Sequence, residues 1–251
     1  TLSASKVPFE VPDRHELSRR LSAVLDVIYL MFNEGYTATV GENWIRPSLC
    51  NEAIRLGRIL AELLPEEPEV HGLVALMEIQ ASRFKARIGP SGEPVLLQDQ
   101  NRALWDYLLI HRGFSALKRI ERLGGVYGPF SLQAAIAACH VRGSSATDTD
   151  WEEISALYDA LAQVAPSPIV ELNRAVAYSM AYGPDAGLEI VDALEGEPFL
   201  KKYHLLPAVR GDLLAKLEKR EEASAEFKRA AALTQNEQER VLLQKRATDL
   251  V

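Results

Sequence analysis

Apolar residues recur along most of the chain with the three-to-four-residue spacing of a helix face. In the first stretch one such face is formed by Leu17, Leu21, Val24, Leu25, Ile28 and Phe32. This period predicts an amphipathic helix that ends near residue 35. Prolines and capping residues then divide the remaining pattern into helices, which we expect at residues 47–64, 67–85, 99–123, 129–141, 151–164, 168–182, 184–195, 203–217, 219–232 and 236–250.

Aspartates mark several of the expected helix starts. Asp13, Asp99 and Asp150 each precede an apolar-periodic segment and are the predicted N-caps. Asp150 is followed three residues later by Glu153, which is the spacing of a capping box. Residues 86–97 interrupt the helical pattern, because Gly-Pro-Ser-Gly separates two short apolar pieces. We expect a small β-hairpin there.

The C-terminal half carries the spacing of a helical repeat. Gly211, Leu214, Ala223, Phe227 and Ala230 stand at offsets 0, 3, 12, 16 and 19, as in a tetratricopeptide repeat. A weaker copy lies upstream at Ala186, Ile190 and Ala193, displaced by 37 residues. We therefore expect an all-α fold, a right-handed superhelical array of antiparallel helix pairs that is tetratricopeptide-like in its C-terminal half. Residues 1–141 would form an N-terminal helical region, and residues 150–251 the repeat pairs with a polar capping helix, packed as one continuous unit.

Charge is unevenly distributed over the 251 residues, whose net charge is −7. Residues 201–251 contain 11 lysines and arginines and 8 acidic residues. Residues 1–200 contain 17 lysines and arginines and 27 acidic residues. An acidic body argues against direct nucleic-acid binding by this chain. The sequence shows neither a bilayer-spanning run nor a signal-peptide pattern, and its two cysteines, Cys50 and Cys139, sit in apolar helical contexts. We expect a cytoplasmic location and no membrane contact.

The sequence contains no constellation typical of catalysis or metal binding. None of the five histidines stands at a metal-ligand spacing, and there is no nucleophile elbow. We therefore expect no enzyme, no catalytic residue, no cofactor and no metal. Polar residues do interrupt apolar helices, notably Arg102 and Trp105, Gln133 and His140, Asn173 and Arg174, and His204 and Arg210. Each could be a satisfied buried group, or together they could line a groove for an anionic or peptide ligand.

The end of the first helix, "YLMFNEGYTAT", places an acid where the helix dipole disfavours negative charge. Gly35 fits the left-handed C′ position, and Tyr36 could pack back on Met31. Asn33 and Glu34 are not explained by such a helix stop. Glu34 needs a positive partner, for which the candidates are Arg46, Arg55 and Arg102.

Seven blocks of the sequence together resemble a known bacterial family. They are "YLMFNEGYTAT", "LCNEAIRLGRILAELLPEEPEVHGLVALM", "LLQDQNRALWD", "GPFSLQAAIAACH", "TDTDWEEISALYDAL", "SPIVELNRAVA" and "YHLLPAVRGDLLAKL". In this order they are similar to the long C-terminal extension of a group of extracytoplasmic-function (ECF) sigma factors (sigma-24/sigma-70 family). Nothing in the chain resembles the sigma domains themselves, so we expect Thr1 to lie just past the promoter-reading helix-turn-helix domain.

The resemblance implies a tetratricopeptide-like extension that regulates the sigma factor in cis. Its implied partners are the sigma domains of the same protein, the RNA polymerase core and a small YCII-related protein, with DNA reached only through the sigma domains. It supports a binding role for Asn33, Glu34, Tyr36, Asp99, Gln100, Arg102, Trp105, Gln133, Asn173, Arg174, His204 and Arg210, and Gly35 also fits the family pattern. The chain departs from the family at Gln80-Ala81, where His-Asp is common, and at Pro207, where His is frequent.

The expected function is therefore a regulatory C-terminal domain that modulates transcription initiation by binding a protein or a ligand. The alternative is a stand-alone helical-repeat scaffold or a small-molecule sensor without catalytic activity. An enzyme would need a perturbed acid or base beside a nucleophile in an enclosed pocket, and the sequence shows no such set.

Overall fold

The computed structural model describes residues 14–39, 44–90, 92–125, 127–143 and 145–250. Within these ranges the chain is helical, with short 3-10 turns between some helices, and the all-α prediction is confirmed. The α-helices are α1 (Arg14–Tyr36), α2 (Pro47–Leu63), α3 (Pro68–Ala81), α4 (Tyr107–Arg122), α5 (Pro129–Arg142), α6 (Trp151–Val164), α7 (Pro168–Tyr182), α8 (Pro184–Leu194), α9 (Leu205–Lys216), α10 (Arg220–Leu233) and α11 (Glu237–Thr248).

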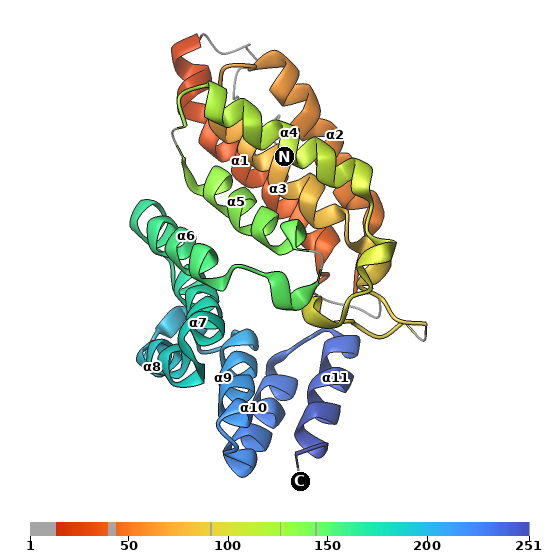
Figure 1. Ribbon diagram of the computed structural model, residues 1–251, viewed down its shortest axis with the longest axis vertical. Coiled ribbons are helices and arrows are strands. Elements are labelled where there is room, and N and C mark those ends of the chain that lie inside the picture. Colours follow the sequence, from red (N-terminus) through yellow and green to blue (C-terminus); the bar gives the residue numbers. More distant parts are fainter. Residues whose placement is uncertain (1–13, 40–43, 91, 126, 144, 251) are drawn as a thin grey trace, which may run out of the picture.

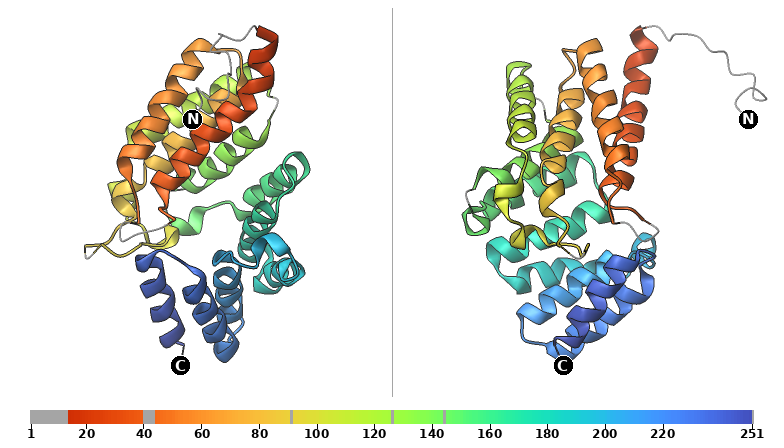
Figure 2. Two further views of the ribbon diagram at one scale, coloured as in Figure 1. Left: turned by 180° about the vertical axis from the view of Figure 1, so that it is seen from behind. Right: turned by 90° about the vertical axis from the view of Figure 1, so that its right-hand side faces the viewer.

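Consecutive helices pack as sequential antiparallel pairs (Figure 1). Helices α1 to α5 form a bundle, and α6 to α11 continue from it as further pairs that curve back toward its loops (Figure 2). The start of α11 thereby lies against the connection between α1 and α2, where Asn236 hydrogen-bonds to Ala38.

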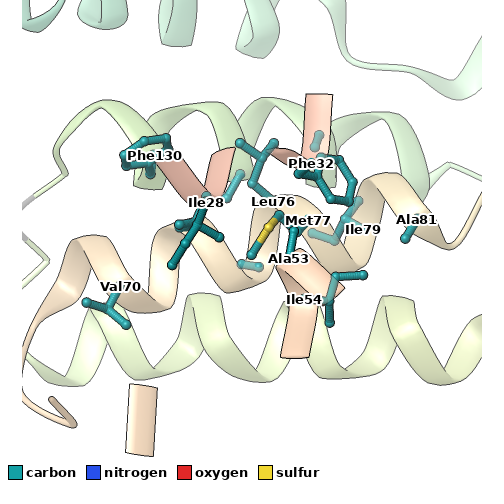
Figure 3. Packing of buried hydrophobic residues seen from close by; sticks show 14 of the residues in the cluster. Ile28, Phe32, Ala53, Ile54, Val70, Leu76, Met77, Ile79, Ala81 and Phe130 are labelled. Carbon is teal, nitrogen blue, oxygen red and sulfur yellow. The ribbon is translucent and has the colours of Figure 1, made fainter. Parts of the chain in front are cut away.

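The centre of the N-terminal bundle is α3, which packs against α1, α2, α4 and α5. Most of its residues are buried, so it is apolar on every side, as expected for a fully enclosed helix. Figure 3 shows Phe32 of α1 and Ile54 of α2 beside Met77 of α3, with Phe130 of α5 farther along the same cluster. The one acid buried in α3, Glu78, is met by Arg58, whose Nε lies 2.7 Å from its Oε1.

Helix starts follow local chemistry, and the structure corrects one of the predicted caps. Asp150 accepts a hydrogen bond from the Glu153 N–H at 2.9 Å, as predicted. Asp99 caps no α-helix, because α4 begins only at Tyr107 and its cap is Asp106, which accepts from two backbone N–H groups. Asp99 and Asp106 offer the same capping chemistry, and Asp106, which directly precedes Tyr107, caps α4. The predicted cap Asp13 lies outside the described residues.

The predicted β-hairpin at residues 86–97 is wrong for the part that the structure describes. One isolated antiparallel bridge joins Ile88 and Pro94, and no strand forms there. The bridge is held by the Val95 N–H on the Arg87 carbonyl at 2.9 Å and the Gly89 N–H on the Glu93 carbonyl at 2.8 Å. The pairing extends no further because 3-10 helices at Phe84–Ala86 and Leu97–Asp99 flank it. The segment instead makes a turn that places 3-10 helices at Leu97–Asp99 and Arg102–Leu104 beside the end of α5.

The second half shows the contacts that the repeat spacing predicts. A Cβ atom on Gly211 of α9 would lie 3.1 Å from the Phe227 ring of α10, so the glycine allows these helices to approach closely. Ala223 and Ala230 of α10 are fully buried at the same interface. In the preceding pair a Cβ on Gly187 would lie 2.6 Å from the carbonyl oxygen of Ala175. The described chain is thus a helical-repeat-like all-α protein.

Candidate functional site

A cavity of about 800 Å³ lies between segments that are distant in the sequence. Its walls come from residues 96–102, the end of α5, α6, α7, α9 and α11. Four residues that the sequence analysis named for a binding groove, Asp99, Arg102, His140 and Asn173, line this cavity. A space of this size, walled by several elements, is typical of a small-molecule or peptide site.

Arg102 is fixed at the C-terminal end of α5. Its Nη1 donates hydrogen bonds to the carbonyl oxygens of His140, at 3.0 Å, and Gly143, at 2.6 Å. Carbonyls at a helix C-terminus lack intrahelical partners and carry partial negative charge, so the guanidinium both caps and neutralises this end. The guanidinium also lies 4.6 Å from the centre of the Trp105 ring, which fixes the side chain from a second direction.

One wall of the cavity consists of aromatic side chains. His140 of α5 and Trp151 of α6 meet edge to face, with ring centroids 5.2 Å apart. Burial, together with the charges of Arg83 and Arg102, lowers the pKa of His140 to about 4, so the imidazole is neutral at pH 7. Tyr158 lies on α6 seven residues after Trp151, and burial raises the pKa of its hydroxyl. This wall therefore offers aromatic surface and neutral polar groups.

Another part of the cavity wall, formed by α9 and α11, carries an ion cluster. Asp212 of α9 accepts a hydrogen bond from Arg246 of α11 and lies 3.2 Å from Nζ of Lys216. Arg246 also lies over the Phe227 ring, 4.3 Å from its centre. The two cations outnumber the one acid that they contact, so this wall has excess positive charge.

The remaining predicted residues lie elsewhere and have local partners. Gln133 accepts from the Tyr29 hydroxyl at 2.9 Å, and Arg174 pairs with Glu171 at 2.8 Å. Arg210 pairs with Asp192 at 2.9 Å. The other side chains outside the cavity wall are Asn33, exposed near the end of α1, Gln100, which donates to the Val95 carbonyl, and Trp105, buried beside Ala86 and Ile110.

His204 lies at the start of α9 beside an acid of α11. Its Nε2 is 3.0 Å from Oε2 of Glu239, which also accepts from the Thr234 hydroxyl at 2.8 Å. Burial by itself would raise the pKa of Glu239, but His204, Thr234 and Trp44 together bring it below its ordinary value. His204 therefore belongs to the contact between the last helical pairs, away from the cavity.

The end of α1 is held by specific contacts, and the structure corrects its predicted stop. Glu34 pairs with Arg46, the first of its three candidate partners, at 3.0 Å, and it accepts from the Thr39 hydroxyl at 2.8 Å. Gly35 is not a left-handed C′ residue, because α1 continues through Tyr36 and Gly35 has no positive φ. It is required instead by packing, since a Cβ there would lie 2.7 Å from Sγ of Cys50.

Tyr36 joins α1 to the segment that follows α3. Its ring stacks on Phe32, with centroids 5.6 Å apart, and its hydroxyl accepts from Arg83 at 2.9 Å. The guanidinium of Arg87 lies 3.5 Å from the ring centre and donates to the Tyr36 carbonyl. Tyr36 is thus a structural link in the bundle.

Sequence reasoning missed four further side chains of the cavity, two aromatic and two basic. Trp151 and Tyr158 share one face of α6, and Lys216 and Arg246 occur in polar stretches of α9 and α11. A signal was present in the seven-residue spacing of the two aromatics. This spacing could not show that the neighbouring helices leave a cavity next to the two aromatic side chains.

A second hollow is an apolar groove between α1 and α2, with a volume of about 580 Å³. Its lining is almost entirely aliphatic, and Val24, Val27, Ile59 and Leu63 are 43%, 65%, 41% and 71% exposed. Val24 was expected to face the core, but the apolar stripe of α1 is wider than the core needs. We call this surface the α1–α2 groove. Contiguous exposed apolar surface of this kind marks an interaction site.

The described residues contain neither a cluster of metal-ligand side chains nor a membrane-spanning helix. No group of three or more histidine, cysteine, aspartate or glutamate side chains is arranged to hold a metal ion there. Among the helices of the same residues, none combines the length and apolar character needed to cross a membrane.

Known proteins of unknown function are similar to parts or most of the chain. Residues 20–121, which extend from α1 into α4, match a family of unknown function (DUF6596). An uncharacterized protein of Rhizobium meliloti (strain 1021) is 46% identical over 238 residues, which are 95% of this chain and 56% of that relative. The chain thus spans little more than half the length of the relative. Residues 20–121 are thus similar to a family of unknown function, DUF6596, and most of the chain is similar to the Rhizobium protein.

Proposed function

We propose that this chain is the regulatory, non-catalytic extension of an ECF sigma factor and that the α1–α2 groove docks the sigma domains of the same polypeptide. The observation that carries the proposal is the groove itself, where Val27 and Leu63 are about two-thirds exposed beside further aliphatic side chains. A single exposed valine needs no explanation, but a contiguous aliphatic surface without a partner is costly in water.

Several observations support an occupant from the same protein. The Rhizobium relative is much longer than this chain, so homologous polypeptides contain further sequence. The groove involves α1, the first helix that the structure describes, and lies within the matched family region. The sequence blocks that resemble the ECF extension supply the identity of the occupant, since sigma domains precede the extension in that family.

The remaining parts of the proposal follow from the same resemblance. The helix pairs α6 to α11 form a right-handed tetratricopeptide-like array, and the protein acts in the cytoplasm. The RNA polymerase core and a small YCII-related protein are further partners. Promoter DNA is contacted only by the sigma domains, in agreement with the acidic composition of residues 1–200.

Promoter transcription with sigma domains joined to this chain tests the proposal. Val27→Lys places a charge in the groove, whereas Val241→Lys changes a valine of α11 that is similarly exposed, at 53%. We expect Val27→Lys to change promoter activity as removal of residues 1–251 does, and Val241→Lys to leave it unchanged. Equal transcription with and without residues 1–251 would refute the regulatory function. Equal activity of Val27→Lys and the unmodified protein would refute docking in the groove.

A further inference from the structure

The cavity described above is separate from the α1–α2 groove and has its own chemistry. It is lined by residues of α5, α6, α7, α9 and α11 and of the segment 96–102, whereas the groove lies between α1 and α2. Its volume, about 800 Å³, lies within the range of sites that enclose a small organic molecule. An inference about its ligand therefore does not depend on where the sigma domains bind.

Arg102 presents unused hydrogen-bond donors at this cavity. Both of its hydrogen bonds to the end of α5 come from Nη1. Its Nε and Nη2 groups make no hydrogen bond to any other residue in the described ranges, although the guanidinium is held in place by two carbonyls and by Trp105. A fixed guanidinium with free N–H groups is the usual receptor for a carboxylate, because two parallel donors match its two oxygens.

The charge balance of the wall also favours an anion. The charged residues that line the cavity are Arg102, Lys216, Arg246, Asp99 and Asp212, three cations against two acids. Asp212 is already satisfied by Lys216 and Arg246, and His140 is neutral at pH 7. Asp148, which lies close enough to favour the charged form of Arg102, is not part of the wall.

The rest of the cavity is suited to an apolar body. Trp151 and Tyr158 supply aromatic surface, and Ile154, Val176 and Leu213 supply aliphatic surface. Aromatic and aliphatic walls around a few fixed polar groups are the common pattern of small-molecule sites, in which the apolar part provides affinity and the polar groups provide orientation.

We propose that this cavity binds an amphipathic organic monocarboxylate, with its carboxylate at Arg102 and its aromatic or aliphatic body against Trp151 and Tyr158. Ligand binding would bridge α5, α6 and α9, because residues of all three helices line the same cavity. The cavity is then a sensor site within the helical array.

Isothermal titration calorimetry with three matched probes tests this proposal on the purified chain. The probes are 4-phenylbutyrate, 4-phenylbutanol and 4-phenylbutylamine, which share one apolar body and differ in head-group charge. We expect the carboxylate to bind about tenfold or more tightly than the alcohol, because a charge-assisted hydrogen bond contributes more than a neutral one. The amine should bind weakest. Equal affinities for the three probes, or no binding of any, would overturn the proposal.

Two arginine variants locate the head-group site. Arg102→Met should lower 4-phenylbutyrate affinity about tenfold or more and leave 4-phenylbutanol affinity unchanged. The matched control is Arg119→Met, because Arg119 also donates to a backbone carbonyl at a helix end, that of Pro65 at 3.2 Å, but lies outside the cavity. An equal effect of the two substitutions would contradict the assignment of Arg102.

A cavity-filling variant keeps the test independent of Arg102, whose loss also uncaps α5. Val176→Trp on α7 fills the space without touching the contacts of Arg102 and should abolish binding of all three probes. Persistence of binding in this variant would place the ligand elsewhere and refute the proposal. Because transcription is not measured, these outcomes are independent of the test of the α1–α2 groove.

Discussion

Asn236 donates a hydrogen bond from Nδ2 to the carbonyl oxygen of Ala38 at 3.1 Å, although 198 positions separate the two residues. Its Oδ1 simultaneously accepts from the backbone N–H groups of Gln238 and Glu239 and so caps α11. One fully buried amide therefore connects the last helical pair to the connection between α1 and α2. An asparagine suits this position because it has a donor and an acceptor on one short side chain.

We predict that Asn236→Asp destabilises the fold even though aspartate is an equally good N-cap. The substitution keeps the acceptor for α11, removes the donor to Ala38 and places a carboxylate against a carbonyl in a buried position. Urea unfolding should show a loss of about 1–3 kcal/mol. The control is Asp150→Asn at the cap of α6, which exchanges the same two residue types and should change stability little. Equal effects would mean that capping, and not the link to Ala38, decides the result.

The close packing of α1 on α2 predicts a large effect of Gly35→Ala. The new Cβ would lie 2.7 Å from Sγ of Cys50 and 2.8 Å from its backbone nitrogen, so the helices must separate. We expect a loss of about 1–3 kcal/mol, seen as a lower Tm in thermal unfolding. Gly196→Ala is the control, because no atom lies within 4 Å of the Cβ position there. A normal Tm for Gly35→Ala would show that the contact is not rigid.

The Glu34–Arg46 pair predicts a modest coupling energy. The side chains are 31% and 44% exposed, so solvent screens much of their attraction. A double-mutant cycle with Glu34→Gln and Arg46→Met should give a coupling of about 0.2–1 kcal/mol in urea unfolding. A coupling of zero would mean that Glu34 is held only by Thr39, whose hydroxyl is 2.8 Å away.

The neutral state of His140 predicts a pH dependence of stability. Its pKa is lowered to about 4 in the folded chain, against an ordinary value of 6.5, so the unfolded chain binds a proton more readily. The free energy of unfolding should therefore fall as the pH decreases from about 6.5 to 4, by as much as roughly 3 kcal/mol from this group.

Substitution of His140 separates its contribution to the pH dependence of stability from the contributions of other titrating groups. The His140→Gln variant should lose part of the slope between pH 6.5 and 4, because glutamine does not titrate. His111→Gln, on the exposed side of α4, should keep the slope of the unmodified chain. Parallel stability curves for the unmodified chain and His140→Gln would show that the imidazole charges freely in the fold.

The sequence predicts most helices because an amphipathic period and a proline or cap are local features. It gave the wrong start for the helix near Asp99, because Asp99 and Asp106 have identical capping chemistry. It could not place Val24, because apolar character alone does not distinguish a core position from an exposed groove. The cavity could not be predicted from local sequence patterns, because it depends on how α5, α6, α9 and α11 pack against one another.

The most direct test of the central claim is hydroxyl-radical footprinting of the α1–α2 groove. The oxidation of Val24, Val27 and Leu63, which are 43%, 65% and 71% exposed in this structure, would be compared between residues 1–251 alone and the same residues joined to sigma domains. Tyr182 and Phe199, exposed on other helices, serve as internal references. We predict that the groove residues are protected in the joined protein while the references are labelled equally. Equal labelling of the groove in both proteins would contradict docking of the sigma domains on α1 and α2.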